Sequence, residues 1–175
     1  KGDGTMLGEG LGMLVLKRLD DAERDGDRIY AVLKGLGSSS DGRGKSVYAP
    51  SAEGQAKALD RAYESAGFGP ETVELVEAHG TGTTVGDAAE VGALSEVFRE
   101  GALGRSRWCA LGSVKSMIGH TKAAAGAAGL IKTALALHHK VLPPTIKVTD
   151  PIKPLTKPDT PFYLNTEKRP WLKGG

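Results

Sequence analysis

Residues 73–83 read VELVEAHGTGT, and residues 109–121 read CALGSVKSMIGHT. Each stretch begins with a short apolar run typical of a buried strand and continues into a glycine-bearing loop that carries one histidine. A pattern typical of a helix follows each loop. Because ligands of open α/β sheets bind outside the carboxyl ends of the strands, the two units predict that His79 and His120 lie at one edge of a sheet.

Apolar periodicity in the rest of the chain predicts an α/β architecture in which helices pack on a sheet. The helical segment after His120 is rich in alanine and glycine. Because glycine costs a helix about 1 kcal/mol relative to alanine, we expect this helix to pack closely against another backbone. The expected elements are strands at 11–18, 28–36, 73–78, 108–113 and 162–164, helices at 19–27, 52–66, 87–100 and 120–139, and a loop at 37–46.

The last third of the chain differs in composition, because seven of the nine prolines fall between Pro143 and Pro170. Proline interrupts regular helix and favours extended backbone. We therefore expect residues 140–175 to form a proline-rich segment that wraps over a surface.

Composition excludes several classes of protein. Cys109 is the only cysteine, which excludes an internal disulfide framework and a cysteine-cluster metal site and fits a reducing, cytoplasmic setting. The 23 basic and 21 acidic residues are interspersed, with a net charge of +2, so no charge pattern indicates nucleic acid or an anionic membrane. No apolar stretch is long enough to span a bilayer, and no signal-peptide pattern opens the chain. We expect no metal, nucleic acid or membrane partner.

Charged residues accompany the two histidines. His120 is expected at the N-terminus of the helix at 120–139, where the helix dipole favours neutral imidazole, which can donate a hydrogen bond to a carbonyl or enolate oxygen. Lys115 lies five residues before His120. Asp87 and Glu90 share one helix face. Because a buried lysine needs a carboxylate, Glu90 is the expected partner of Lys115.

Other reactive side chains have simpler interpretations. The stretch HGTGTTVG at 79–86 lacks the Gly-Lys-Ser/Thr of a phosphate-binding P-loop. His138 and His139 are neighbours near a helix end, point in different directions and interact favourably with the dipole. Cys109 lies inside a predicted strand, which disfavours a nucleophilic role. A lone histidine is more often an ordinary loop residue, but two in matched loops favour a functional pair.

Together these motifs resemble the β-ketoacyl synthase family, the condensing enzymes of fatty acid and polyketide synthesis. The resemblance covers essentially the whole chain, and the two histidine motifs are highly specific. Residues 39–50 (SSDGRGKSVYAP) and 161–171 (PFYLNTEKRPW) look most like ketosynthases of polyunsaturated fatty acid synthases and iterative, enediyne-type polyketide synthases. The matching stretches are Gly8-Glu9-Gly10, Glu77 to Thr83, Gly86-Asp87 with Glu90, Gly112 to Ser116, Gly119-His120-Thr121 and Pro143-Pro144-Thr145.

The resemblance implies a thiolase-like fold with αβαβα layers, of which this chain would hold the C-terminal half and the end of the N-terminal half. It also implies a decarboxylative Claisen condensation, in which malonyl carried on acyl carrier protein extends an acyl chain held on a cysteine. No cofactor is implied beyond the phosphopantetheine arm of the carrier protein. The implied partners are acyl carrier protein, the remainder of the ketosynthase domain and a second copy in a homodimer.

The resemblance assigns roles to the residues of both loops. His79 and His120 would promote decarboxylation and stabilise the enolate and thioester oxygen. The remaining assignments are Lys115 and Glu90 for the polar network with Asp87 in support, and Thr81 and Thr83 for hydrogen bonds to the phosphopantetheine arm.

Two family motifs are missing from the chain. The Asp-Thr-Ala-Cys-Ser type motif that carries the nucleophile is absent, Cys109 does not match it, and the Gly-Phe-Gly-Gly-Thr-Asn type loop is absent as well. Tyr48 stands where many relatives have threonine, so no pantetheine role is assigned to it. Residues 1–175 are therefore interpreted as the C-terminal portion of a ketosynthase domain, inactive alone because covalent catalysis needs a thiolate.

Three other functions remain open at this point. A non-elongating binding protein of the chain-length-factor type would have another residue in place of the nucleophile, although the presence of both histidines and Lys115 disfavours it. A thiolase acting on coenzyme A esters more often uses histidine with cysteine. An α/β interaction module without chemistry would leave the paired motifs unexplained.

Overall fold

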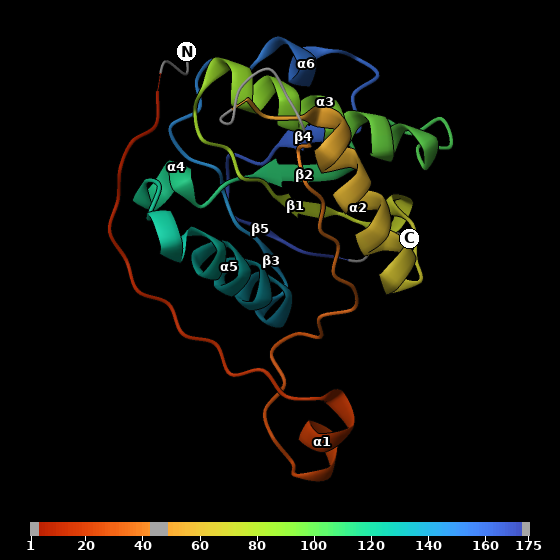
Figure 1. The fold of residues 1–175 in the computed structure, drawn as a ribbon, viewed down its shortest axis with the longest axis vertical. Helices are drawn as coiled ribbons and strands as arrows, with labels where there is room; N and C mark the ends of the chain where they lie inside the picture. Colours follow the sequence, from red (N-terminus) through yellow and green to blue (C-terminus); the bar gives the residue numbers. More distant parts are fainter. Residues whose placement is uncertain (1–3, 43–48, 173–175) are drawn as a thin grey trace.

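The computed structural model describes residues 4–42 and 49–172, and a three-stranded parallel sheet lies at its centre (Figure 1). The strand order is β1 (Leu75–Glu77), β2 (Cys109–Gly112), β4 (Phe162–Leu164), so β2 is central. The other elements are α1 Leu19–Arg24, α2 Ala52–Ala66, the 3-10 turn Pro70–Thr72, α3 Thr84–Glu100, α4 Lys115–Ile118, the 3-10 turn Lys122–Ala124, α5 Ala125–His139, β3 Val141–Leu142, α6 Lys153–Thr156 and β5 Arg169–Pro170.

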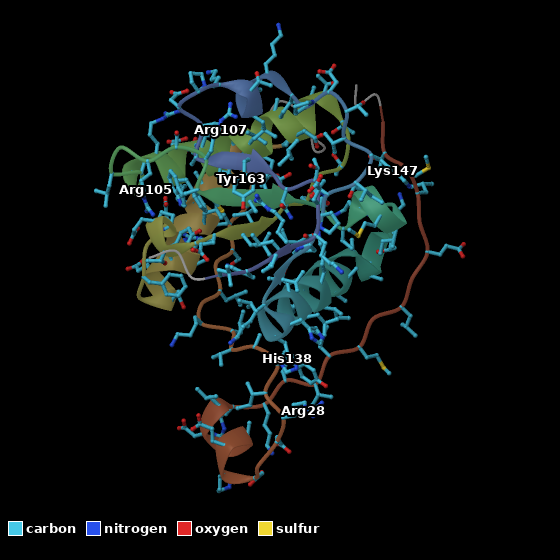
Figure 2. The ribbon with its side chains drawn as sticks, turned by 180° about the vertical axis from the view of Figure 1, so that it is seen from behind. Arg28, Arg105, Arg107, His138, Lys147 and Tyr163 are labelled. Atoms are coloured by element: carbon cyan, nitrogen blue, oxygen red, sulfur yellow. The ribbon has the colours of Figure 1, made fainter. Side chains whose placement is uncertain are left out.

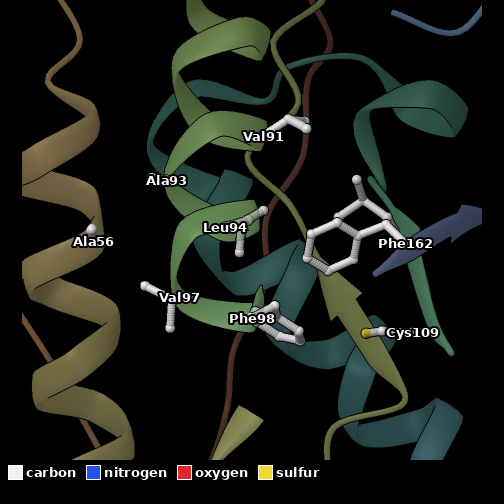
Figure 3. Close-up of a cluster of buried hydrophobic side chains, with 9 residues drawn as sticks. Ala56, Val91, Ala93, Leu94, Val97, Phe98, Cys109 and Phe162 are labelled. Atoms are coloured by element: carbon white, nitrogen blue, oxygen red, sulfur yellow. The ribbon is translucent and has the colours of Figure 1, made fainter. Parts of the chain in front are cut away.

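The main hydrophobic core lies between the sheet and α3, with α2 packed alongside. Phe98 of α3 and Phe162 of β4 are fully buried, and their ring centroids lie 4.9 Å apart (Figure 3). The rest of the buried cluster comes from the same elements: Ala56, Val91, Ala93, Leu94, Val97, Cys109 and Leu111. The parallel strands that support the histidine loops are therefore held from this face by aliphatic and aromatic packing.

Helix α5 lies against the opposite face of the sheet. Side chains alternate along a strand, so Glu77 and its register partner Gly112 face away from the core that holds Leu111. A Cβ atom at Gly129 of α5 would lie only 3.2 Å from Glu77 Cγ. This contact confirms the close packing predicted for the small-residue helix.

The helix predicted at 52–66 is confirmed at both ends, because both ends carry clear local signals. The Ser51 side chain accepts a hydrogen bond from the Gly54 amide, as an N-cap residue does. Gly67 ends the helix with φ of +75°, a conformation that glycine adopts without strain.

The central elements are confirmed with small shifts in their bounds. The strands predicted at 73–78 and 108–113 are β1 and β2, each shorter by a few residues, and the strand near 162–164 is β4. The helix predicted at 87–100 is α3, which begins earlier at Thr84 because Thr83 caps it.

Two predicted strands, at 11–18 and 28–36, are wrong. The first segment leads into α1 and the second leads away from it, and neither pairs with a strand. Helix α1 itself lies apart from the sheet (Figure 1). Leu11 and Val15 are 91% and 97% exposed. A strand needs a hydrogen-bonded neighbour, and no described segment supplies one. The predicted loop at 37–46 lies partly outside the described residues.

The predicted helix at 120–139 begins later than expected, and the preceding loop is partly helical. Residues 115–118 form α4, and α5 begins at Ala125. Two positive φ angles interrupt the backbone between them, at Gly119 (+76°) and Lys122 (+55°). The segment after 140 is mostly irregular, but it also contains α6 and the antiparallel pair β3 and β5, which the proline pattern did not predict.

We predict that Phe162→Ala lowers the free energy of unfolding by about 3–5 kcal/mol, because it removes a fully buried aromatic ring and leaves a cavity. Chemical denaturation followed by circular dichroism measures the loss. Leu103→Ala is the control, since Leu103 is 83% exposed, and its effect should stay within about 0.5 kcal/mol. Equal effects of the two substitutions would contradict the location of the core.

Candidate functional site

The two predicted histidines lie together at the carboxyl ends of β1 and β2. The two strands are parallel neighbours, with Glu77 opposite Gly112, so both chains leave the sheet at the same edge. The rings of His79 and His120 are edge to face, with centroids 5.3 Å apart and planes at 90°. The expectation that both histidines share one edge is confirmed.

The His79 turn is held by the carboxylate of Glu90. The amides of His79 and Gly80 donate to its two oxygens, at 2.6 Å and 2.9 Å. Ser113 Oγ donates to the His79 carbonyl at 3.3 Å, which ties this turn to the other loop. Glu90 therefore acts on the backbone of the turn and leaves the His79 ring free to face His120.

Asp87 and the two threonines hold the next part of the same loop. Asp87 Oδ1 accepts from the Gly82 amide at 3.2 Å. Burial and the nearby charge of Glu90 raise the Asp87 pKa, and the Gly82 amide opposes that rise. Thr83 Oγ1 accepts from the Gly86 amide and lies 2.9 Å from Thr81 Oγ1. Thr83 is therefore the N-cap residue of α3.

The segment at residues 5–8 contacts both histidine loops. Thr5 Oγ1 donates to the Thr81 carbonyl at 2.9 Å. The Gly8 amide donates to the His120 carbonyl at 3.1 Å, and the His120 amide donates to the Met6 carbonyl at 2.8 Å. A side chain at Gly8 would collide with the Ile118 carbonyl, so this approach requires glycine.

The surroundings of His120 favour its neutral form. The Lys122 amide donates to Nδ1 of His120 at 3.1 Å, which places the proton of the neutral ring on Nε2. Desolvation, then the positive charge of Lys115, the nearby His79 and the charge of Lys122 lower the His120 pKa. The predicted neutral state agrees with this shift, but the predicted cause is wrong: α5 begins at Ala125, so its dipole does not start at His120.

Lys115 opens α4 and is half-buried beside the same site. Burial lowers its pKa, while the negative charges of Glu77 and Glu90 oppose that shift. The predicted ion pair between Lys115 and Glu90 is wrong: within the described part of the chain, Lys115 has no ion-pair partner within 4 Å. Both oxygens of Glu90 already accept backbone hydrogen bonds, so its charge acts on Lys115 from a distance.

Two clefts meet at the histidine pair. The larger has a volume of about 1040 Å³, and its lining includes Thr81, Thr83 and the apolar side chains of Leu59 and Leu94. The smaller has a volume of about 480 Å³ and runs along α5; Glu77 and Lys115 line it. His79 and His120 border both clefts. A group bound beside the two rings is thus accessible from the threonine side and from the lysine side.

The structure keeps the other candidate side chains away from this site. Cys109 is fully buried, and desolvation raises its pKa to about 12, which leaves it protonated and unreactive at neutral pH. His138 lies at the far end of α5, where its ring centroid is 4.8 Å from that of Tyr30 (Figure 2). Among residues 4–42 and 49–172 there is no cluster of three or more metal-ligating side chains and no helix long and apolar enough to cross a membrane.

Two contributions to the site were not predicted from the sequence. The first is the contact of residues 5–8 with both loops; the glycines Gly8 and Gly10 were noted only as part of a resemblance. The second is Glu77, whose carboxylate accepts from the Val114 amide and pairs with Lys132 of α5. The signal for Glu77 was a second charged residue in the run VELVEA, two residues before His79.

Known proteins are similar to this chain in sequence and in fold. Residues 30–149 match the family described as beta-ketoacyl synthase, C-terminal domain. A polyunsaturated fatty acid synthase of Thraustochytrium sp. (strain ATCC 26185 / S-3) is 51% identical over 98% of this chain and 6% of that protein. The polyketide synthase PksL of Bacillus subtilis (strain 168) is 48% identical over 97% of this chain and 4% of that protein.

Solved structures agree with the sequence comparison. The ketosynthase from module 6 of the bacillaene synthase from Bacillus subtilis 168 superposes with a TM-score of 0.86 at 46% identity, over 91% of this chain and 29% of that one. The ketosynthase from module 1 of the bacillaene synthase from Bacillus amyloliquefaciens FZB42 gives a TM-score of 0.88 at 40% identity, over 97% and 30%. The chain thus spans less than a third of the ketosynthases that it resembles.

We predict that Lys115→Gln raises the His120 pKa, because it removes a positive charge that disfavours imidazolium. In the unchanged chain His120 should titrate below the ordinary value of about 6.5, as an Nε2–H tautomer. Titration followed by histidine NMR resonances measures both properties. Lys140→Gln, at the far end of α5, should leave His120 unchanged; a His120 pKa that does not respond to Lys115→Gln would contradict the described electrostatics.

Proposed function

This chain belongs to the β-ketoacyl synthase family and has its thiolase-like α/β fold, and we propose that it supplies the His–His–Lys part of a condensing active site. The reaction is the decarboxylative Claisen condensation of an acyl thioester with malonyl on acyl carrier protein. The observation that carries the proposal is the convergence of His79 and His120 at the ends of β1 and β2, with ring centroids 5.3 Å apart.

The chemistry follows from what neutral imidazole can donate. Decarboxylation breaks the bond between the malonyl α-carbon and its carboxylate, and the electron pair moves onto the thioester oxygen as an enolate. The Nε2–H of His120 donates a hydrogen bond to that oxygen as its charge develops. His79, whose ring is in edge-to-face contact with that of His120, donates the second hydrogen bond. The enolate carbon then attacks the acyl thioester, and the thiolate leaves.

Lys115 and the threonines have supporting roles in the proposal. The Lys115 ammonium, half-buried beside both rings, stabilises negative charge on the malonyl group and keeps His120 neutral. Thr81 and Thr83 line the larger cleft, where their hydroxyls hydrogen-bond the amides of a phosphopantetheine arm. Asp87 and Glu90 hold the backbone of the loop that carries His79 and these threonines.

The acyl-carrying cysteine is proposed to come from protein outside these 175 residues. Cys109 has no access to either cleft and a strongly raised pKa, so it cannot serve as the nucleophile. The exposed apolar segments on either side of α1 support the same proposal. Side chains such as Leu11 (91% exposed) and Met13 (85%) have the pattern of a buried strand, and contiguous exposed apolar surface marks a contact with other protein.

The proposed partners follow from this arrangement. The remainder of a ketosynthase domain covers the apolar segments and completes the site. Acyl carrier protein delivers the malonyl group, and a second copy completes a homodimer. The setting is the cytoplasm, where the buried Cys109 stays reduced.

A binding protein of the chain-length-factor type is the second candidate, because it shares the fold without elongating a chain. The ordered His79–His120 pair and the nearby Lys115 favour the condensing enzyme, since a protein that only binds needs none of the three. The residue at the nucleophile position decides between them.

In a complete ketosynthase that carries this sequence, His79→Ala and His120→Ala should each lower kcat for condensation by about a hundredfold or more, because each removes a donor to the developing oxyanion. Cys109→Ala is the control and should change kcat by less than about threefold, since its thiol lies in the core. Product formation from malonyl-acyl carrier protein measures all three. Normal elongation by both histidine variants would refute the proposal.

A further inference from the structure

Glu77 and Lys132 form the most buried ion pair in the described part of the chain, and the proposed reaction gives neither a role. Glu77 Oε2 lies 2.7 Å from Lys132 Nζ, and each side chain is only 12% exposed. Every other ion pair among residues 4–42 and 49–172 has at least one side chain that is 36% exposed or more.

One carboxylate joins three elements at this point. Glu77 is the last residue of β1, two residues before His79. Its Oε1 accepts from the Val114 amide at 2.5 Å, and Val114 directly precedes Lys115. Its Oε2 pairs with Lys132 of α5. The strand that leads to His79 is therefore tied to the turn that carries Lys115 and to the helix behind both.

A gain in the free energy of unfolding does not explain why the Glu77–Lys132 ion pair is buried. Two charges lose their hydration when they are buried, and a buried ion pair is often no more stable than an apolar pair of the same size. The backbone of α5 is also adapted to the carboxylate, because Gly129 leaves the space that Glu77 Cγ occupies. A charged group held here at such cost points to a role in the neighbouring site.

We propose that Glu77 is a positioning residue for the condensing site. Its carboxylate fixes the backbone of the Val114–Lys115 turn, and its ion pair with Lys132 sets how much negative charge reaches the Lys115 ammonium. This inference rests on the proposed function of the site, but it concerns two residues to which that function assigns nothing.

The proposal predicts the direction in which each substitution changes the Lys115 pKa. The charged groups that act on Lys115 are Glu77 of β1 and Glu90 of α3, both of which raise its pKa against the effect of burial. Glu77→Gln keeps an oxygen for the Val114 amide but removes the charge, so the Lys115 pKa falls. Lys132→Met removes the cation that offsets Glu77, so the Lys115 pKa rises.

Hydrogen exchange tests the positioning without using activity. In a complete ketosynthase that carries this sequence, Glu77→Ala should speed exchange of the Val114 amide by about tenfold, the effect of one lost hydrogen bond. Glu77→Gln should preserve the slow exchange. Glu74→Ala is the matched control: Glu74 lies directly before β1 and accepts from Trp171 Nε1, whereas the Val114 amide donates to Glu77. Unchanged protection in Glu77→Ala would overturn the inference.

The pH dependence of condensation tests the charge. Glu77→Gln should move the basic limb of the kcat profile to lower pH, Lys132→Met should move it to higher pH, and Glu74→Gln should leave it in place. If Glu77→Gln and Lys132→Met lower kcat equally and do not shift the basic limb in opposite directions, the ion pair is only structural. That result would overturn the proposed effect of Glu77 and Lys132 on the charge of Lys115. If the unchanged enzyme does not condense at all, the proposed function fails, and the exchange experiment alone still decides the positioning.

Discussion

The parallel pairing of β1 with β2 is the constraint on which the site depends. Parallel strands leave a sheet at the same edge, and the register that places Glu77 opposite Gly112 makes the two following turns neighbours. His79 and His120 belong to different turns and are 41 residues apart (120 − 79), yet their rings are in edge-to-face contact. A slip of β1 by one residue against β2 would turn β1 over relative to its neighbour and send Glu77 into the apolar core.

Carboxylates accept hydrogen bonds from the backbone amides of these turns. Tight turns next to a reactive site expose backbone amides that have no partner in a helix or sheet, and buried amides without partners are costly. Glu90 accepts the amides of His79 and Gly80, Asp87 accepts that of Gly82, and Glu77 accepts that of Val114. The acidic residues around the histidines therefore support the loops first, and their charges influence the site as a consequence.

The sequence predicts correctly the elements whose ends are set by neighbouring residues, and it does not predict features that depend on contacts with distant segments. Helix α2 was correct to the residue because Ser51 caps its start and Gly67 its end. The start of α5 was misplaced because Gly119 and Lys122 take positive φ angles where residues 6–8 bind the His120 turn, a contact invisible to local periodicity. The strands expected at 11–18 and 28–36 have the right side-chain pattern, but strand formation needs a neighbour, and the described residues offer none. The histidine pair is predictable because both residues follow the same strand–loop–helix pattern. The predicted partner of Lys115 is wrong because both oxygens of Glu90 accept backbone hydrogen bonds.

The positive charges near the histidines favour an anionic ligand at this site. Lys115 and Lys122 both lower the His120 pKa, and burial in turn lowers that of Lys115. No carboxylate of the described chain pairs with the Lys115 ammonium within 4 Å, because Glu77 is bound to Lys132 and Glu90 to two amides. A half-buried cation beside a neutral imidazole is poorly compensated until an anion arrives. In the proposed reaction the malonyl carboxylate, or the enolate formed from it, would supply that negative charge beside Lys115 and His120.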